Sequence, residues 1–228
     1  MLDVSRHIKL YQKLSHKIKN SNILVAGAGG LGSTVLQNLV RIGFKNITIY
    51  DPKEIDPPDL NRQILFDSTD IGKSKVQVAK EKLLKINPEC NIDIFPEKIT
   101  KHTKLNKHFD IIFDCLDNTE SRFDLDELSL KYKVPLIHGS VEEYRGEITV
   151  IYPGITKSLK EIFLGYYSTQ CWQVIPPTVL IAASFQVSEG LKILEGNFED
   201  ALLNKILFFD ILHNDFEIIN VKGIKDHK

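Results

Sequence analysis

The sequence has few cysteines, no long hydrophobic run and no excess of one charge sign. Its three cysteines, Cys90, Cys115 and Cys171, are widely spaced and form no C-x-x-C pair, so neither a disulfide framework nor an all-cysteine zinc site is expected. No apolar run approaches the ~18 residues of a membrane-spanning helix, and the N-terminus lacks the apolar core of a signal peptide. These absences predict a cytoplasmic protein that uses no membrane.

The charges are balanced along the chain. There are 29 Lys and Arg residues against 30 Asp and Glu residues, and the two signs are interspersed. This balance provides no electrostatic footprint for nucleic acid or an anionic membrane, so small ligands or a protein partner are expected instead. The 228 residues are enough for one sizeable α/β core.

The strongest local pattern is a buried strand followed by glycines. The run Ile23-Leu24-Val25-Ala26 precedes Gly27, Gly29 and Gly32, which have the G-x-G-x-x-G spacing, and a helical apolar pattern follows. Such a turn can approach a phosphate closely and present free N–H groups at a helix N-terminus. We therefore predict a phosphorylated ligand here, although the same spacing serves nicotinamide, flavin and ATP sites and can also reflect close packing.

The rest of the chain alternates predicted strands and helices. Strands are expected at residues 46–50, 91–95, 109–115, 134–139, 146–152, 206–210 and 216–221, with helices between most of them. This order predicts an α/β fold with a Rossmann-like, doubly wound, mainly parallel sheet that antiparallel strands extend at the C-terminal end. We expect an N-terminal helical arm over residues 1–20 and a single domain over residues 21–222, with a crossover loop at about 153–176.

Charged side chains follow the predicted strands. Asp51 lies about twenty residues beyond the glycines, where it can accept ribose hydroxyls. Arg62 lies in the aperiodic segment that follows, and Lys75 begins the next helix, either to meet an anion or as a solvated lysine. Asp117 follows a central strand, where it either caps a helix or holds Mg²⁺ on a triphosphate. Together these groups suit attack on an α-phosphate with release of pyrophosphate.

Several short stretches of the sequence carry a more specific signal. They are Ser5-Arg6-His7-Ile8, Gly27-Ala28-Gly29-Gly30-Leu31-Gly32, Leu60-Asn61-Arg62-Gln63, Gly72-Lys73-Ser74-Lys75, Asp114-Cys115-Leu116-Asp117-Asn118 and Arg145-Gly146. Together they resemble the ThiF/MoeB/HesA family, relatives of the adenylation domain of ubiquitin-activating enzymes. The resemblance runs from about Ser5 to Val221. It implies an ATP-binding adenylation domain that joins AMP to the C-terminal glycine of a ubiquitin-like sulfur-carrier protein ending in Gly-Gly.

The resemblance also implies roles for individual residues. Asp51 would contact the ribose, Arg62 and Lys75 the triphosphate, and Asp117 a Mg²⁺ ion on ATP. Arg6, a solvated helix charge by periodicity alone, would reach into the partner subunit's site, which implies a homodimer. The nucleotide site would also include Gly27, Gly29, Gly30, Gly32, Asp59, Asn61 and Asn118. The implied pathway is thiamine or molybdopterin-type cofactor biosynthesis, with a sulfurtransferase or cysteine desulfurase as a further partner.

The sequence departs from the family pattern at three places. Asp59 stands where the family usually has Asn, so it adds a negative charge that either binds through metal or weakens ATP affinity. The paired C-x-x-C zinc site of many members is absent, and no zinc is expected. Finally, the segment before Cys171 is short. Cys171 aligns with the cysteine that some relatives use for a thioester or acyl-persulfide, although a lone thiol is often inert.

Other functions remain alternatives at this point. The chain could adenylate a small molecule or a tRNA base, or it could be a non-catalytic module that binds a ubiquitin-like tail, which Asp59 favours. A nicotinamide oxidoreductase is the alternative at the level of the fold. Arg62 and Lys75 favour adenylation, because hydride transfer needs neither cation.

Overall fold

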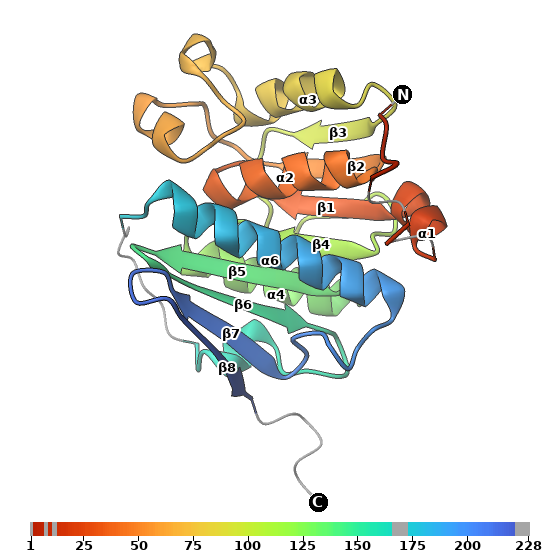
Figure 1. Ribbon diagram of the computed structural model, residues 1–228, viewed down its shortest axis with the longest axis vertical. Coiled ribbons are helices and arrows are strands. Elements are labelled where there is room, and N and C mark those ends of the chain that lie inside the picture. Colours follow the sequence, from red (N-terminus) through yellow and green to blue (C-terminus); the bar gives the residue numbers. More distant parts are fainter. Residues whose placement is uncertain (1, 7–8, 11–12, 166–172, 222–228) are drawn as a thin grey trace, which may run out of the picture.

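The computed structural model describes residues 2–6, 9–10, 13–165 and 173–221. An eight-stranded sheet with the order β3-β2-β1-β4-β5-β6-β7-β8 crosses the molecule (Figure 1). Strands β1 to β5 pair in parallel, whereas β6, β7 and β8 are antiparallel to their neighbours, which confirms the predicted fold class. The strands are β1 (Asn22–Ala26), β2 (Asn46–Tyr50), β3 (Asn91–Phe95), β4 (Ile111–Asp114), β5 (Leu136–Glu142), β6 (Arg145–Ile151), β7 (Lys205–Asp210) and β8 (Asp215–Asn220).

Helices cover both faces of the sheet. Ile23 and Val25 of β1 belong to one buried cluster with residues of α2, α3 and α6, while Leu24 and Ala26 belong to a second cluster with residues of α4 and α5. This alternation follows from the two-residue period of a strand. In Figure 1, α2 and α6 lie in front of the sheet and α4 lies behind it. The helices are α1 (Ser15–Asn20), α2 (Gly30–Ile42), α3 (Lys75–Ile86), α4 (Thr119–Tyr132), α5 (Leu159–Ile162) and α6 (Pro176–Glu195), with short 3₁₀ segments at Pro57–Asn61 and Ser68–Asp70.

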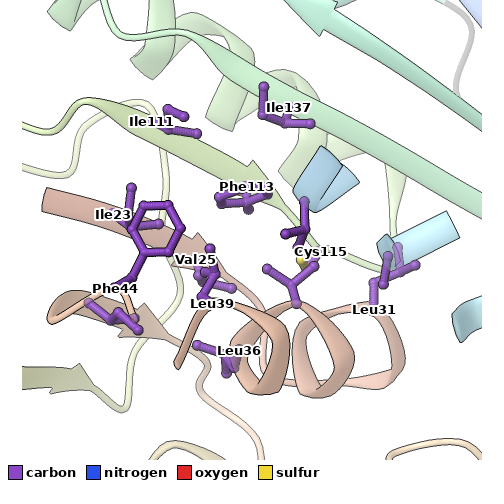
Figure 2. Close-up of a cluster of buried hydrophobic side chains, with 14 of the residues drawn as sticks. Ile23, Val25, Leu31, Leu36, Leu39, Phe44, Ile111, Phe113, Cys115 and Ile137 are labelled. Atoms are coloured by element: carbon purple, nitrogen blue, oxygen red, sulfur yellow. The ribbon is translucent and has the colours of Figure 1, made fainter. Parts of the chain in front are cut away.

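The front core fixes α2 against the first strands. Figure 2 shows Leu36 and Leu39 of α2 beside Val25 of β1, with Phe113 of β4 close by. The helix ends at Gly43, which has a φ of 111° and bonds back to the carbonyls of the last turn. Only glycine takes this left-handed cap without steric cost. The packing therefore sets where the N-terminus of α2 lies over the end of β1.

The strand order reverses direction between β1 and β4. From β1 the chain continues to β2 and β3 on one side and then crosses to β4 and β5 on the other. In open α/β sheets, ligands bind outside the carboxyl ends of the strands at such a switch point. The arrowheads of β1, β3 and β5 point to the left in Figure 1, and β2 and β4 run parallel to β1, so the turns after β1, β2 and β4 all lie at this end of the strands.

The N-terminal arm is less helical than predicted. Within the described residues of the predicted 1–20 helix, only Ser15–Asn20 is helical. Leu10 is 80% exposed, whereas Leu14 and Ile18 are buried against the front core. A short helix needs tertiary packing of its apolar face, and Leu14 and Ile18 supply that packing for the last part of the arm. The prediction of a helical arm over residues 1–20 was wrong for its first part.

The predicted crossover at about 153–176 contains the short helix α5, and residues 166–172 of it lie outside the described residues. Ser158 and Glu161 form a reciprocal capping box at the start of α5, which explains why a helix this short is formed. In the part of the chain that the structure describes, no helix combines the length and the apolar character needed to cross a membrane.

Candidate active site

The glycine turn serves both close packing and ligand approach, at different glycines. A Cβ on Gly27, where φ is 98°, would lie 2.5 Å from the carbonyl oxygen of Cys115, and a Cβ on Gly32 would lie 2.0 Å from the carbonyl oxygen of Gly27. These two glycines are needed for the backbones to fit together. A Cβ on Gly29 would have its nearest neighbour at 3.7 Å, and a Cβ on Gly30 would have its nearest neighbour at 3.1 Å. Both neighbours are side-chain atoms, so the turn is more open at these two glycines.

Asp51 fixes the turn to the end of β2. One carboxylate oxygen accepts the N–H of Ala28, and the other accepts the N–H of Lys53, both at 2.8 Å. Asp51 is 6% exposed, so the carboxylate is held rigidly beside the glycines. Each carboxylate oxygen can accept more than one hydrogen bond, so this anchoring leaves acceptor capacity for a ribose hydroxyl.

Asp59 joins the two cations predicted to bind phosphate. Its Oδ2 lies 2.8 Å from Nζ of Lys75, and its Oδ1 lies 3.7 Å from the Arg62 guanidinium. Lys75 is only 4% exposed, so the alternative of a solvated lysine was wrong. Burial raises the pKa of Asp59, but Lys75, the Asp56 N–H and Arg62 outweigh it and hold that pKa below its usual range. Asp59 is therefore an ionised counter-charge for both cations.

The segment that carries Asp59 lies directly on the glycine turn. A Cβ on Gly29 would lie 3.7 Å from Nε2 of Gln63, and a Cβ on Gly30 would lie 3.7 Å from Cγ of Arg62. The same Gln63 amide donates to Oδ1 of Asp59 at 2.6 Å. The structure therefore brings the glycines, Arg62 and Lys75 together, although residues 52–74 show no periodicity.

Asp117 is not a helix cap. The residue that caps α4 is Asn118, whose side-chain oxygen accepts the N–H of Ser121 at 2.9 Å. This leaves the Asp117 carboxylate free of the helix, and it pairs instead with Nζ of Lys53 at 2.5 Å. Partial burial raises the pKa of Asp117, but Lys53 and Asn118 outweigh it and hold that pKa below its usual range.

Lys53 connects the turns after β2 and β4, and the sequence analysis missed it. Its side chain is 56% exposed and that of Asp117 is 65% exposed, and such exposed pairs contribute little stability. The pair can therefore open at low cost when a ligand enters. The sequence signal that could have identified Lys53 is its position, because it lies two residues after Asp51 at the carboxyl end of β2.

Two predicted site residues are not brought to this cluster. Arg6 is exposed, and nearby Val4 lies against Gly43 at the far end of α2. That end of α2 lies at the amino-terminal ends of the parallel strands, where α1 also lies (Figure 1). Cys171 lies outside the described residues. Asn61 contacts the cluster through Arg62, whose guanidinium donates to its side-chain oxygen at 3.0 Å.

The donor set suits a magnesium ion that is shared with a nucleotide. Among the described residues no group of three or more His, Cys, Asp and Glu side chains is arranged to hold a metal. Mg²⁺ keeps several waters and commonly binds through one or two carboxylates together with substrate phosphates. Asp117 fits that role, since its carboxylate is accessible at the edge where the glycine turn lies.

We predict that Gly32→Ala destabilises the fold, because the new methyl group would collide with the Gly27 carbonyl. Forcing extra volume into packed backbone costs about 1–3 kcal/mol and occasionally more, and we expect the upper part of this range in urea unfolding. Gly30→Ala is the matched control, since its methyl group would meet side-chain atoms and not backbone, namely a Val179 methyl group at 3.1 Å and Cγ of Arg62 at 3.7 Å. Equal losses in both variants would show that the close approach is not the constraint.

We predict that Asp59→Asn also lowers the free energy of unfolding, because it leaves the buried Lys75 ammonium without its counter-charge. Removing one partner of a buried ion pair costs about 3–5 kcal/mol, and we expect a loss in this range, because the single amide oxygen can accept from Gln63 or from Asp56 but not from both. Because the folded-state pKa of Asp59 is lowered, its contribution is present above the ordinary aspartate pKa and is lost as the pH falls. The double variant with Lys75→Met should recover most of the loss; if it does not, the pair is not the cause.

The whole chain is similar to known proteins. The profile of the ThiF family matches residues 4–228. SUMO-activating enzyme subunit 2 of Dictyostelium discoideum is 40% identical over 151 residues, which cover 65% of this chain and 23% of that protein. Molybdopterin-synthase adenylyltransferase of Haemophilus influenzae is 33% identical over 187 residues, which cover 78% of this chain and 76% of that protein.

Solved structures show the same fold. The crystal structure of E. coli MccB with ATP superposes with a TM-score of 0.83 at 24% sequence identity, covering 97% of this chain and 72% of that chain. Several curated relatives are longer proteins. For four of them, the SUMO-activating enzyme subunit included, the matched region covers only 23% to 63% of the relative's own length.

Proposed function

The chain belongs to the ThiF family, and from this premise we propose that it is an ATP-dependent adenylyltransferase acting on the C-terminal glycine of a ubiquitin-like sulfur-carrier protein. One observation carries the proposal. The glycine turn, Asp51, Arg62 and Lys75 are linked by direct contacts at the switch point, and Lys53 links Asp117 to them. The name of the Haemophilus influenzae relative supports the same class of reaction.

In the proposed complex each group of the cluster has a separate task. The free N–H groups of the glycine turn would receive a phosphate of ATP. The Asp51 carboxylate would accept the ribose hydroxyls. Arg62 and Lys75 would neutralise the phosphates that leave, after exchanging their contacts with Asp59 for contacts with ATP. Asp117 would hold Mg²⁺, which supplies further charge neutralisation when it is bound with ATP.

The proposed reaction needs no general acid or base. A carboxylate oxygen of the carrier's terminal glycine forms a bond to the α-phosphorus, and the bond from that phosphorus to the bridging oxygen breaks. Pyrophosphate leaves with the electron pair of the broken bond, and the carrier keeps AMP. Alignment and charge neutralisation therefore supply most of the rate, which matches a site with the cations Lys53, Arg62 and Lys75 and, within the described part of the chain, no histidine paired with them.

A groove gives the carrier tail a route to this site. A cavity of about 350 Å³ lies on the face of the antiparallel strands, and its lining includes Ser140, Glu142, Arg145 and Glu147. Strand β5 pairs with β4 up to His138 and then continues past the end of β4 into the groove. One end of the groove is therefore near the turn that carries Asp117, where an extended glycine-terminated tail would need to arrive.

Further parts of the proposal concern partners. We also propose a homodimer in which Arg6 acts in the other subunit's site, because Val4, two residues before Arg6, lies against Gly43 at the end of α2 away from the glycine turn. Cys171 is proposed as a thiol that displaces AMP from the carrier adenylate to give a thioester. The Haemophilus influenzae relative favours a molybdopterin-type pathway over thiamine, with a sulfurtransferase or cysteine desulfurase as sulfur source.

Asp59 favours a second candidate, a non-catalytic module that binds a ubiquitin-like tail. Its carboxylate neutralises the cations that ATP would need, and it does so from within the site. A chain that keeps the fold and the groove but has lost ATP binding would have this arrangement. ATP binding measured by calorimetry separates the two candidates.

We predict that ATP–pyrophosphate exchange with Mg²⁺ appears with one member of a panel of small carriers ending in Gly-Gly. Asp117→Ala should reduce this exchange about 100-fold or more, as expected for loss of a group that stabilises charge in the transition state. Asp93→Ala is the matched control, because Asp93 also pairs with a lysine, Lys107 at 2.7 Å, but lies on the edge strand β3. It should retain exchange.

Other outcomes of this assay would contradict the proposal in different ways. Measurable ATP binding without exchange for any carrier would indicate a different acceptor, such as a small molecule or a tRNA base. Absence of ATP binding would indicate the binding module.

We predict that Asp59→Asn binds ATP more tightly than the wild type, because Arg62 and Lys75 would no longer be neutralised within the protein. Removing one competing charge at this range should lower the dissociation constant about 3- to 10-fold, less at high salt. Calorimetry at two salt concentrations measures both effects. Weaker binding by this variant would mean that Asp59 positions the cations instead of competing for them.

A further inference from the structure

A buried ion pair lies directly behind the turn that carries Asp117. Asp114, the last residue of β4, and His138 of β5 are both almost completely buried, and Oδ2 of Asp114 lies 2.7 Å from Nδ1 of His138. Burying ionised groups is costly unless they are paired and hydrogen-bonded. The proposed reaction uses neither side chain directly.

The second oxygen of Asp114 connects this pair to the turn. Oδ1 of Asp114 accepts the N–H of Leu116 at 3.1 Å. The carbonyl of Leu116 in turn accepts two bonds from the Arg122 guanidinium, at 2.8 Å and 3.2 Å. Both backbone groups of the residue before Asp117 are therefore held, one by Asp114 and the other by Arg122.

The surroundings of His138 are mostly acidic. Glu147 of β6 places Oε1 3.6 Å from Nε2 of His138, Asp126 and Arg122 face it from α4, and Phe163 packs against the ring edge. Burial lowers the pKa of His138, but Asp114 and Glu147 outweigh burial and hold that pKa above its usual range. The raised pKa of His138 favours the protonated form of the ring, and burial raises the pKa of the nearby Asp126.

We infer that His138 is a positioning residue of the adenylation site, which acts through Asp114 and Leu116 to fix the backbone that presents Asp117. The inference rests on the proposed function for its effect on catalysis. Nδ1 of His138 lies at hydrogen-bond distance from Oδ2 of the fully buried Asp114, which leaves Oδ1 of the same carboxylate to accept the N–H of Leu116. Without the ring, Asp114 loses its buried partner, and the N–H of Leu116, the residue before Asp117, loses a fixed acceptor.

Two substitutions separate the hydrogen bond from the charge. His138→Leu removes both, whereas His138→Asn retains a neutral N–H donor close to the position of Nδ1. A misplacement of about 1 Å in a catalytic group can cost about 100-fold in rate. We expect His138→Leu to reduce exchange about 30-fold and His138→Asn about 5-fold, with a matching rise in the Mg²⁺ concentration needed for half-maximal rate.

Two further readouts distinguish positioning from a general loss of stability. In an Asp117→Ala background, His138→Leu should cause no further loss of exchange, because the group that it positions is gone. The wild-type rate should fall toward that of His138→Asn as the pH rises through the raised pKa of His138, since the neutral ring is then only a donor. Losses that multiply in the double variant, or equal pH profiles for wild type and His138→Asn, would overturn the inference.

A measurement on the free protein separates this inference from the proposed function. We expect the Leu116 amide to exchange its hydrogen at least tenfold faster in His138→Leu, while the Cys115 amide, which donates to Ala26, stays protected. Unchanged protection of Leu116 in His138→Leu and His138→Asn would remove the positioning role whatever the activity. If the Leu116 amide exchanges its hydrogen faster in His138→Leu but the wild type shows no ATP–pyrophosphate exchange with any carrier, the proposed function is wrong. The inference that His138 holds the turn would then still stand.

Discussion

The arrangement of this molecule depends on the close approach of three backbone segments at the end of β1. The first turn of α2 rests on the Gly27 carbonyl, and Gly27 itself rests on the carbonyl of Cys115, with no room for a side chain at either contact. Because of this contact the turns after β1 and β4 share one location. Asp51 then adds the turn after β2 by bonding to Ala28. A phosphate-sized anion approaching the glycines therefore meets groups from all three turns.

The charges of the site are already paired in the free protein. Asp59 holds Arg62 and Lys75, and Lys53 holds Asp117, so the cluster has few uncompensated charges before a nucleotide arrives. The two pairs differ in kind. The pair of Asp59 with Lys75 is buried and stabilises the 52–74 segment, whereas the pair of Lys53 with Asp117 is exposed and adds little. The phosphates of a nucleotide must therefore replace the buried Asp59 carboxylate as the partner of Lys75. A metal ion at Asp117 has to displace only the weakly held Lys53.

Much of the fold could be predicted from the sequence, because each parallel strand is a short apolar run bounded by clear turn residues. The glycines, Asp51 and Asp117 follow such strands, and the convergence of strand ends brought them together as expected. Pairing across the fold could not be predicted. Lys53, Asp114 and His138 acquire their partners only when β2, β4 and β5 are assembled into one sheet, and nothing near them in the sequence marks this. In the N-terminal arm the sequence predicted too much structure. The helical spacing of apolar residues extends over residues 1–20, but the helix that packs against the core is Ser15–Asn20.

The sheet order divides the chain into two working parts. The contacts of the nucleotide cluster come from residues 27–117, on the turns after β1, β2 and β4, while the groove lies on β5 to β8, in residues 140–217. Antiparallel strands appended at one edge can change their outward side chains without moving the parallel strands. An engineer could therefore exchange the groove-lining positions to redirect the protein to another carrier and leave the nucleotide chemistry in place. His138 on β5 and the groove-lining Glu147, which faces it from β6, are exceptions, because they support the turn that carries Asp117 and any such graft would have to retain them.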